Sequence, residues 1–328
     1  MSSYIIRRLL QAIPTILGVT LLSFLLMQAA PGDPVAMMTS NPTNTAADRE
    51  RLRREFCLDR SVPEQYAIWL FGDLSGACAQ GGLVRGDFGT SFRDRRPVLP
   101  TILERVPATL ELTGSALLVG VVVGMAVGLS SAIRRGSLFD NAGRFLSVLF
   151  DAIPSFWFGL ILIMFFTVEL GWLPVGGRAP LNDPNPDPAE RLQHLVLPCL
   201  VLAVTWVAVI SRYMRAQSLE VINQDYVRTA QAKGLPERVV NSRHVGRNAL
   251  IPIVTILGPA ITGLIGGAVV IERIFSWPGL GRLAVDAVSA RDYPVVMGTV
   301  LIGSILVILG TLLADLLLVV VDPRIRFD

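Results

Sequence analysis

Long apolar runs without charge are the feature that most limits how this chain can fold. The first run extends from Leu9 to Gly32, and the last extends from Tyr293 to Val321 with only Asp315 inside it. A helix of about 20 apolar residues crosses a hydrocarbon core of roughly 30 Å. Six such segments are predicted, at 9–32, 112–133, 145–168, 195–211, 248–271 and 293–321. The sequence therefore predicts an all-α polytopic membrane protein with six transmembrane helices.

Composition removes several other classes of protein. Hydrophobic residues make up 52% of the 328 residues and charged residues only 17%, whereas soluble domains carry about 25% charged residues. A soluble enzyme and a disordered chain are both excluded on this ground. Lys233 is the only lysine and follows Ala232, so the chain lacks the Gly-Lys pair of a Walker A phosphate loop. With two histidines and three cysteines far apart, no metal site and no bound cofactor are expected.

The positions of the basic residues predict orientation. Arginine precedes the first apolar segment and crowds the links 134–144 and 212–247 and the C-terminal end. By the positive-inside rule, both termini and these links face the cytoplasm. The loop 33–107 then faces outward, as does the segment 274–294. We expect three parts: residues 1–32 with the first helix, which is not a cleaved signal peptide, an extracytoplasmic loop domain at 33–107, and a membrane core at 108–328.

The link 212–247 is too long for a turn and too patterned for a simple linker. Ala230 and Gly234 are four residues apart, so they are expected to share a helix face that admits another backbone closely. Gly234 permits a left-handed turn that ends this helix, and Pro236 suits the first turn of a second one. Arginines follow at 238, 243 and 247. Two interpretations remain open at this point: a bent amphipathic helix pair that projects from the membrane to a partner, or a helix that lies on anionic lipid.

Specific motifs in this link resemble a known family. Residues 226–234 read YVRTAQAKG, 243–244 read RH and 248–252 read NALIP. This pattern is similar to the coupling loop of bacterial ABC importer permeases, above all the first permease subunit of the dipeptide, oligopeptide and nickel group. Further similarity lies in PGDP at 31–34, GDFGTS at 86–91, IFSWPGLG at 274–281, RDYPVV at 291–296 and DPRI at 322–325. One departure is that Arg228, Thr229 and Ala230 stand where the general importer signature has Glu-Ala-Ala.

The resemblance implies a type I ABC importer permease in the bacterial inner membrane. Such a chain is not an enzyme: it forms half of a translocation pathway for short peptides, beside a second related permease subunit. Two cytoplasmic ATPase subunits would bind ATP and Mg, and an extracytoplasmic solute-binding protein would deliver the ligand. Nickel chelates or glutathione are alternative cargoes for the same architecture. Rival classes are an ion-coupled secondary carrier, disfavoured by the coupling loop, and an intramembrane enzyme, for which the spans offer no convergent catalytic groups.

The resemblance also assigns roles to residues. Contact with the ATPases is expected from Arg228, Thr229, Ala230, Ala232, Lys233, Gly234, Leu235, Arg238 and Arg243. The mouth of the pathway, on the binding-protein side, is expected at Trp277, Pro278, Gly279, Asp292 and Tyr293.

Two further expectations rest on position alone. Cys57 and Cys78 both lie in the outward loop, where an oxidising compartment favours a disulfide, and the alternative is two unpaired thiols. Cys199 lies in the fourth span and is not a plausible partner. Glu272, near the end of the fifth span, is expected to reach water.

Overall fold

The computed structural model describes residues 2–38, 45–73, 78, 82–180, 183 and 186–321. These residues form helices joined by turns, and no β-strand occurs among them. The chain divides into two compact units. We call residues 108–277 with those from 309 onward the central unit, and residues 2–107 with 278–308 the N-terminal unit. The prediction of an all-helical chain is confirmed for the described residues.

Within the described part of the chain, four helical stretches are long and apolar enough to cross a membrane. They are Tyr4–Ala29, Val98–Ile133, Pro188–Ile222 and Tyr293–Val319. They contain or closely match four of the six predicted segments. A bent pair, Leu138–Ala152 with Ser155–Glu169, makes a fifth if it is counted as one span. The helix α13 (Ile251–Ile274) occupies the place of the segment predicted at 248–271.

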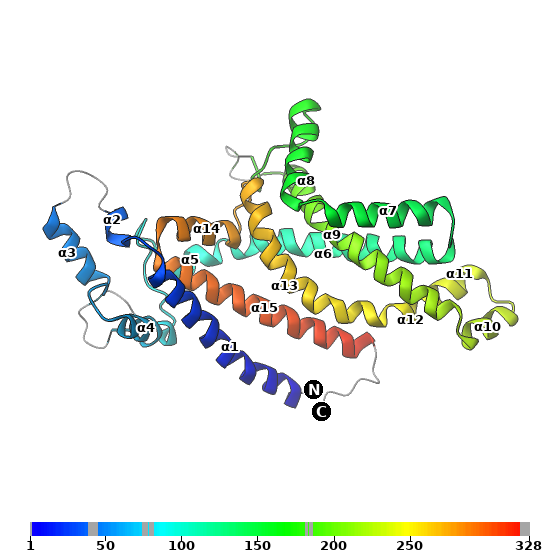
Figure 1. Cartoon of the computed structure of the whole chain (residues 1–328), viewed down its shortest axis with the longest axis horizontal. Helices are drawn as coiled ribbons and strands as arrows, with labels where there is room; N and C mark the ends of the chain where they lie inside the picture. Colours follow the sequence, from blue (N-terminus) through cyan, green and yellow to red (C-terminus); the bar gives the residue numbers. More distant parts are fainter. Residues whose placement is uncertain are drawn as a thin grey trace. The chain divides into compact units, whose positions relative to one another are not determined.

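The prediction of one continuous helix at 145–168 is wrong. Helix α7 (Leu138–Ala152) ends at Ile153, and the chain bends by 103° before α8 (Ser155–Leu162) begins. Helix α8 then continues into a π-helical segment, η2 (Ile163–Glu169). Figure 1 shows the sharp change of direction between α7 and α8. The cause is Pro154, which has no N–H to donate and forces the preceding residue out of the helical region. Accordingly Ile153 has an extended ψ of 125°.

The fourth predicted span is a much longer helix than the apolar run suggested. Helix α9 covers Pro188–Ile222, or 35 residues, and includes Pro198 in its interior. Its first turn is capped by Asp187, whose side chain accepts a hydrogen bond from the N–H of Ala189. The final turns carry Arg212 and Arg215, which lie beyond the apolar stretch. Residues 212–222 of the predicted link are therefore a direct extension of this helix.

A glycine stripe lets α6 (Val106–Ile133) approach α9 closely. Gly120, Gly124 and Gly128 recur at every fourth position, so they lie on one face of the helix. A Cβ atom at Gly124 would lie 2.9 Å from the Cβ of Ile210, and one at Gly128 would lie 2.5 Å from the carbonyl oxygen of Ser211. Small residues at helix contacts serve this purpose in membrane proteins, where close packing replaces the hydrophobic drive.

The N-terminal unit builds its own core from short helices around two long ones. Its elements are α1 (Ser2–Ala29), α2 (Pro34–Met38), α3 (Ala46–Glu55), α4 (Val62–Phe71), η1 (Leu83–Arg85), α5 (Val98–Leu103), α14 (Leu280–Ala290) and the first half of α15 (Tyr293–Val321). Val98 and Ile102 of α5 are fully buried against Leu280, Ala287 and Val296. This apolar cluster holds the segment before α6 against α14.

Candidate functional site

The centre of the predicted contact surface is a short helix, α10 (Asp225–Ala232), which follows α9 after a two-residue turn. Gly234 adopts φ +75°, its N–H bonds to the carbonyl of Gln231 at 2.9 Å, and the N–H of Leu235 bonds to that of Ala230 at 3.4 Å. These two bonds form a Schellman motif, which satisfies carbonyls at the end of a helix. The prediction that Gly234 ends this helix in a left-handed turn is confirmed.

The inner face of α10 packs on its own surroundings. Val227 and Ala230 are buried in a cluster with Val240 and Val245, against Leu129 of α6 and the last turn of α9. The expectation that Ala230 and Gly234 share one helix face is therefore wrong. Ala230 faces inward, and Gly234 lies beyond the last helical residue, where a left-handed turn has already changed the direction of the chain.

The outer side of this segment carries the remaining predicted contact residues. Those exposed are Arg228, Thr229, Ala232, Lys233, Gly234, Leu235, Arg238 and Arg243. The side chain of Arg228 is 70% exposed, and Asp225, 3.8 Å away, is its nearest ion-pair partner. We call these exposed residues of 228–243 the outer face of the α10 segment.

After α10 the chain continues to α13 through three short helical pieces. Pro236 caps α11 (Glu237–Val239), which runs into the π-helical η3 (Val240–Gly246) and then α12 (Arg247–Ala249). Val240 and Val245 supply the inner surface, whereas Arg238 and Arg243 point away from it. The bent pair of helices predicted from the sequence is thus present, with α10 as one arm and α11 to α12 as the other (Figure 1).

A buried ion pair joins α9, the helix that leads into this segment, to α7. Arg215, two turns before the end of α9, donates from Nε to Asp140 Oδ1 at 2.6 Å and from a terminal nitrogen to Oδ2 at 2.8 Å. The Asp140 side chain is 1% exposed, and its Oδ2 also accepts from the N–H of Gly136. This fork-to-fork geometry is the strongest form of a side-chain ion pair. Sequence reasoning missed it, because both residues were counted only as cytoplasmic charges.

A second pair joins the same two helices in a different setting. Arg212 donates to Asp151 at 2.9 Å, but the two side chains are 39% and 45% exposed. Solvent weakens a pair of this kind. The buried Arg215–Asp140 pair is therefore the firmer of the two connections between α9 and α7.

The predicted mouth residue Trp277 does not reach the surface. Its side chain is fully buried, and its Nε1 donates to the carbonyl of Ala108 at 2.8 Å. Glu272, expected to reach water, is also fully buried and accepts from the hydroxyl of Thr109 at 2.7 Å. Both residues lie in the central unit, where Ile271, Phe275 and Trp277 pack as one cluster. Here Trp277 and Glu272 hold α13 against the start of α6, and Trp277 is not exposed on the surface of this chain.

The other predicted mouth residues belong to the N-terminal unit. Asp292 is 3% exposed; its carboxylate accepts from the hydroxyl of Ser91 at 2.5 Å and from the N–H of Phe92 at 3.0 Å. Tyr293 is half-buried, with its ring centroid 6.1 Å from that of Phe92. Pro278 is half-buried and Gly279 is buried. Asp292 thus anchors the loop at 91–93 and is not an exposed contact.

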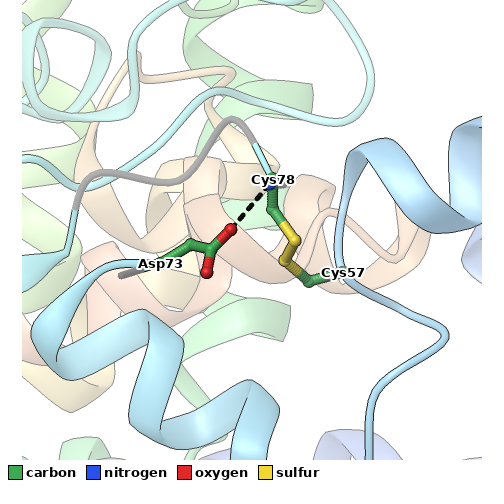
Figure 2. A group of neighbouring side chains, drawn as sticks. All are labelled: Cys57, Asp73 and Cys78. Atoms are coloured by element: carbon green, nitrogen blue, oxygen red, sulfur yellow. Dashed lines mark hydrogen bonds between the residues drawn. A yellow bond between two sulfur atoms is a disulfide. The ribbon is translucent and has the colours of Figure 1, made fainter. Parts of the chain in front are cut away.

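The structure joins Cys57 and Cys78 in a disulfide, with Cα atoms 5.7 Å apart. Figure 2 shows the bridge beside Asp73, whose carboxylate accepts from the N–H of Cys78 at 2.8 Å. These three side chains are close enough to be considered as metal ligands. However, metals bind the thiolate form of cysteine, and sulfurs joined in a disulfide do not supply it. The bridge ties the C-terminal end of α3 to the segment after α4.

Comparison with known proteins places this architecture among transport components. Residues 120–327 match the family described as binding-protein-dependent transport system inner membrane component, and residues 1–113 match its N-terminal membrane component. The chain is 46% identical to the oligopeptide transport system permease protein AppB of Bacillus subtilis strain 168, with all of both chains covered. It is 40% identical to the dipeptide transport system permease protein DppB of Escherichia coli K12, with 99% of each chain covered.

A further relative and a solved structure agree with this assignment. The di/tripeptide transport system permease protein DppB of Pseudomonas aeruginosa strain UCBPP-PA14 is 42% identical over 99% of each chain. Among solved structures, the inward-facing MetNI methionine ABC transporter matches with a TM-score of 0.55 and 21% identity. That match covers 69% of this chain and 98% of the other. At this identity the structural match shows a shared fold and nothing about cargo.

Proposed function

Because the chain belongs to the family of binding-protein-dependent transport system inner membrane components, we propose that it is a permease subunit of an ATP-driven importer of short peptides. The observation that carries this proposal is full-length similarity to permeases named for oligopeptide, dipeptide and di/tripeptide transport. The match of residues 1–113 to the N-terminal membrane component extends this similarity to the part of the chain that contains the short helices α2 to α5. The chain has a non-catalytic role, and its partners hydrolyse ATP.

The proposed topology has six spans with both termini in the cytoplasm. The five candidate spans and α13 supply the helices. Basic residues on the links 134–144 and 212–247 support a cytoplasmic location for the α10 segment. The disulfide of Cys57 and Cys78 supports the opposite location for the loop 33–107, because disulfides persist in oxidising compartments. The protein then lies in the bacterial inner membrane.

The proposed partners follow from the family, whose members are inner membrane components of binding-protein-dependent transport systems. A second related permease completes the pathway, two ATP-binding subunits hold ATP and Mg, and an extracytoplasmic solute-binding protein delivers the peptide. The outer face of the α10 segment is the proposed seat for an ATPase subunit. It combines basic groups that can pair with acidic residues and an apolar contact from Leu235, which is 39% exposed. Rigid-body motion of the ATPases would then move α10 with α9 as a lever.

The inner side of this segment supports the lever proposal. Force applied to α10 reaches α9 through the cluster of Val227, Ala230, Val240 and Val245. It reaches α7 through the buried pair of Arg215 and Asp140. Since both connections are close-packed or bidentate, the α10 segment moves with the helices and not independently of them.

The test is peptide uptake by proteoliposomes that contain defined sets of subunits. We expect uptake of radiolabelled dialanine only when this chain, the second permease, both ATPases, the binding protein and ATP are all present. Omission of the ATPases should abolish uptake, and an imposed proton or sodium gradient should not restore it. Uptake by this chain alone, or uptake driven by an ion gradient without ATP, would overturn the proposal.

A further inference from the structure

A cavity of about 190 Å³ lies inside the N-terminal unit. Its walls come from the loop at 91–96, from α5 and the turn that follows it, and from α14 with the residues just after it. In the proposed topology all of these segments face outward. The cavity is smaller than the roughly 300–1,000 Å³ of sites that hold drug-sized ligands. It therefore suits a small molecule or one charged end of a larger one.

Three arginines and three aspartates make up the charged lining of this cavity. Arg93 and Arg96 come from the loop, and Arg105 comes from the turn between α5 and α6. The Nε of Arg105 is buried and has no hydrogen-bond partner among the described residues. Buried polar groups are almost always hydrogen-bonded in folded proteins, so each exception calls for an explanation. A guanidinium has no neutral form to adopt at ordinary pH.

The acidic groups around the cavity are already engaged elsewhere. Asp292 accepts from Ser91 and from two backbone N–H groups. The carboxylate of Asp94 accepts from the N–H of Arg96 at 3.1 Å. Asp286 lies 3.8 Å from Arg282. None of these contacts involves Arg105, so among the described residues the cavity retains a cation that its own carboxylates do not hold.

The remaining lining arginines differ from Arg105 in their partners. Arg96 forms an ion pair with Glu104 at 2.8 Å, where both side chains are about half exposed. The side chain of Arg93 is exposed, and among the described residues its guanidinium makes no hydrogen bond or ion pair. Arg93 and Arg105 together offer donors to an anion from the rim and from the wall of the cavity.

We propose that this cavity binds the carboxylate of a short peptide on its way into the transporter, with Arg105 as the main donor and Arg93 as the second. A guanidinium presents parallel N–H donors that match the two oxygens of a carboxylate. A free short peptide, the cargo of the proposed function, carries a carboxylate at its C-terminus. The inference thus rests on the proposed function and adds to it a subsite that reads the C-terminus of the cargo.

Occupancy can be measured at a cysteine placed in the wall. Ala290 is half-buried and lines the cavity at the end of α14. In the assembled transporter in proteoliposomes, with no binding protein present, the Ala290→Cys chain is treated with a neutral maleimide. We expect dialanine to slow the modification and dialaninamide, which lacks the carboxylate, to leave it unchanged. Adding Arg105→Gln should raise the dialanine concentration needed for protection by about tenfold or more, the loss expected for one charge-assisted hydrogen bond.

Matched variants separate recognition from folding. Arg49→Gln makes the same charge change on the exposed surface of α3 and should leave protection intact. Arg105→Lys keeps the charge without the fork and should recover part of the protection. If Arg105→Gln fails to assemble, Arg93→Gln provides the same test from the rim. Equal effects of dialanine and dialaninamide, or protection that survives both arginine changes, would overturn the proposal.

The source of the carboxylate is decided by a second arm. If only the unloaded binding protein protects Ala290→Cys, the anion comes from an acidic side chain of that partner and the cargo subsite is wrong. ATP-driven uptake of dialanine is recorded in the same proteoliposomes. Uptake without any peptide protection would remove this inference alone, whereas absence of peptide uptake by the unsubstituted assembly would remove the proposed function itself.

Discussion

Arg215 and Asp140 form a bidentate ion pair across 75 positions of sequence, with N–O distances of 2.6 and 2.8 Å. The pair joins α9 to the first turn of α7, and Asp140 is almost completely buried. Residues 225–249 follow directly from α9. The orientation of the proposed ATPase seat relative to the membrane helices therefore depends on this contact.

Removing one partner of this pair should destabilise the central unit. For Arg215→Gln we expect the free energy of unfolding to fall by about 3 kcal/mol. This value is near the lower end for a broken buried ion pair, because the Arg215 side chain is 21% exposed. The matched control is Arg212→Gln on the same helix, whose partner Asp151 is exposed; it should cost less than about 1 kcal/mol. Thermal unfolding of the purified assembly checks both. Equal losses in the two variants would show that burial does not set the strength of these pairs.

Gly234 should tolerate asparagine better than alanine. Its φ is +75°, yet a Cβ at this position would meet no atom within 4 Å. Backbone strain is then the whole penalty, about 1–2 kcal/mol for alanine and less for asparagine, which enters the left-handed region more readily. Coupled ATP hydrolysis, stimulated by the loaded binding protein, is the measurement. Equal activity of Gly234→Ala and Gly234→Asn would mean that the left-handed turn is not needed for coupling.

Tryptophan should act differently at Ala230 and at Ala232. Ala230 is 5% exposed in an apolar cluster, so Ala230→Trp overpacks it and should lower the amount of folded chain. Ala232 is exposed at the end of the same helix. We expect Ala232→Trp to preserve insertion and folding but to reduce ATP-driven uptake, because the added ring holds the ATPase away. The yield of folded protein after detergent extraction and ATP-driven peptide uptake are measured for both variants. A folded and fully active Ala232→Trp variant would contradict the proposal that the ATPase binds the outer face of the α10 segment.

The glycine stripe of α6 should not accept even a methyl group at its tightest point. A Cβ at Gly128 would lie 2.5 Å from the backbone oxygen of Ser211, which cannot move aside cheaply. Gly128→Ala should therefore separate α6 from α9 and lower thermal stability. Gly114→Ala is the control in the same helix, where a Cβ meets nothing within 4 Å; helix propensity predicts no loss or a gain of up to about 1 kcal/mol. Similar melting temperatures for the two variants would contradict the packing.

Hydropathy predicted where the long helices lie but not how they bend or extend. The run at 293–321 coincides with α15, because a long apolar stretch with one charge, Asp315, leaves little else for the backbone to form. Hydropathy does not report the direction of a helix axis, however. The 103° bend at Ile153 and Pro154 was therefore missed, although Pro154 stands in the sequence. The extension of α9 past Ser211 was missed because its last turns are polar. These turns carry Arg212 and Arg215, which pair with Asp151 and Asp140 of α7.

The sequence predicted local backbone structure at the site residues more reliably than it predicted which of their side chains are buried. The turn at Gly234 follows from local chemistry, and the structure has it. The burial of Ala230, Trp277 and Glu272 depends instead on which neighbours surround them in the folded chain. The pairing of Arg215 with Asp140 could have been suspected only from two charges beside apolar runs. Spacing alone does not identify partners so far apart in sequence.

Cross-linking from the outer face of the α10 segment tests the central claim most directly. A single cysteine is placed at Ala232, which is exposed, or at Ala230, which is buried, in the complete assembly, and a short thiol-to-amine cross-linker is added. The account predicts a covalent product with an ATPase subunit from Ala232→Cys, altered in yield when ATP is bound, and little or none from Ala230→Cys. No ATPase product from Ala232→Cys in an active assembly, or modification of that cysteine by a membrane-impermeant reagent from the outer side, would contradict it.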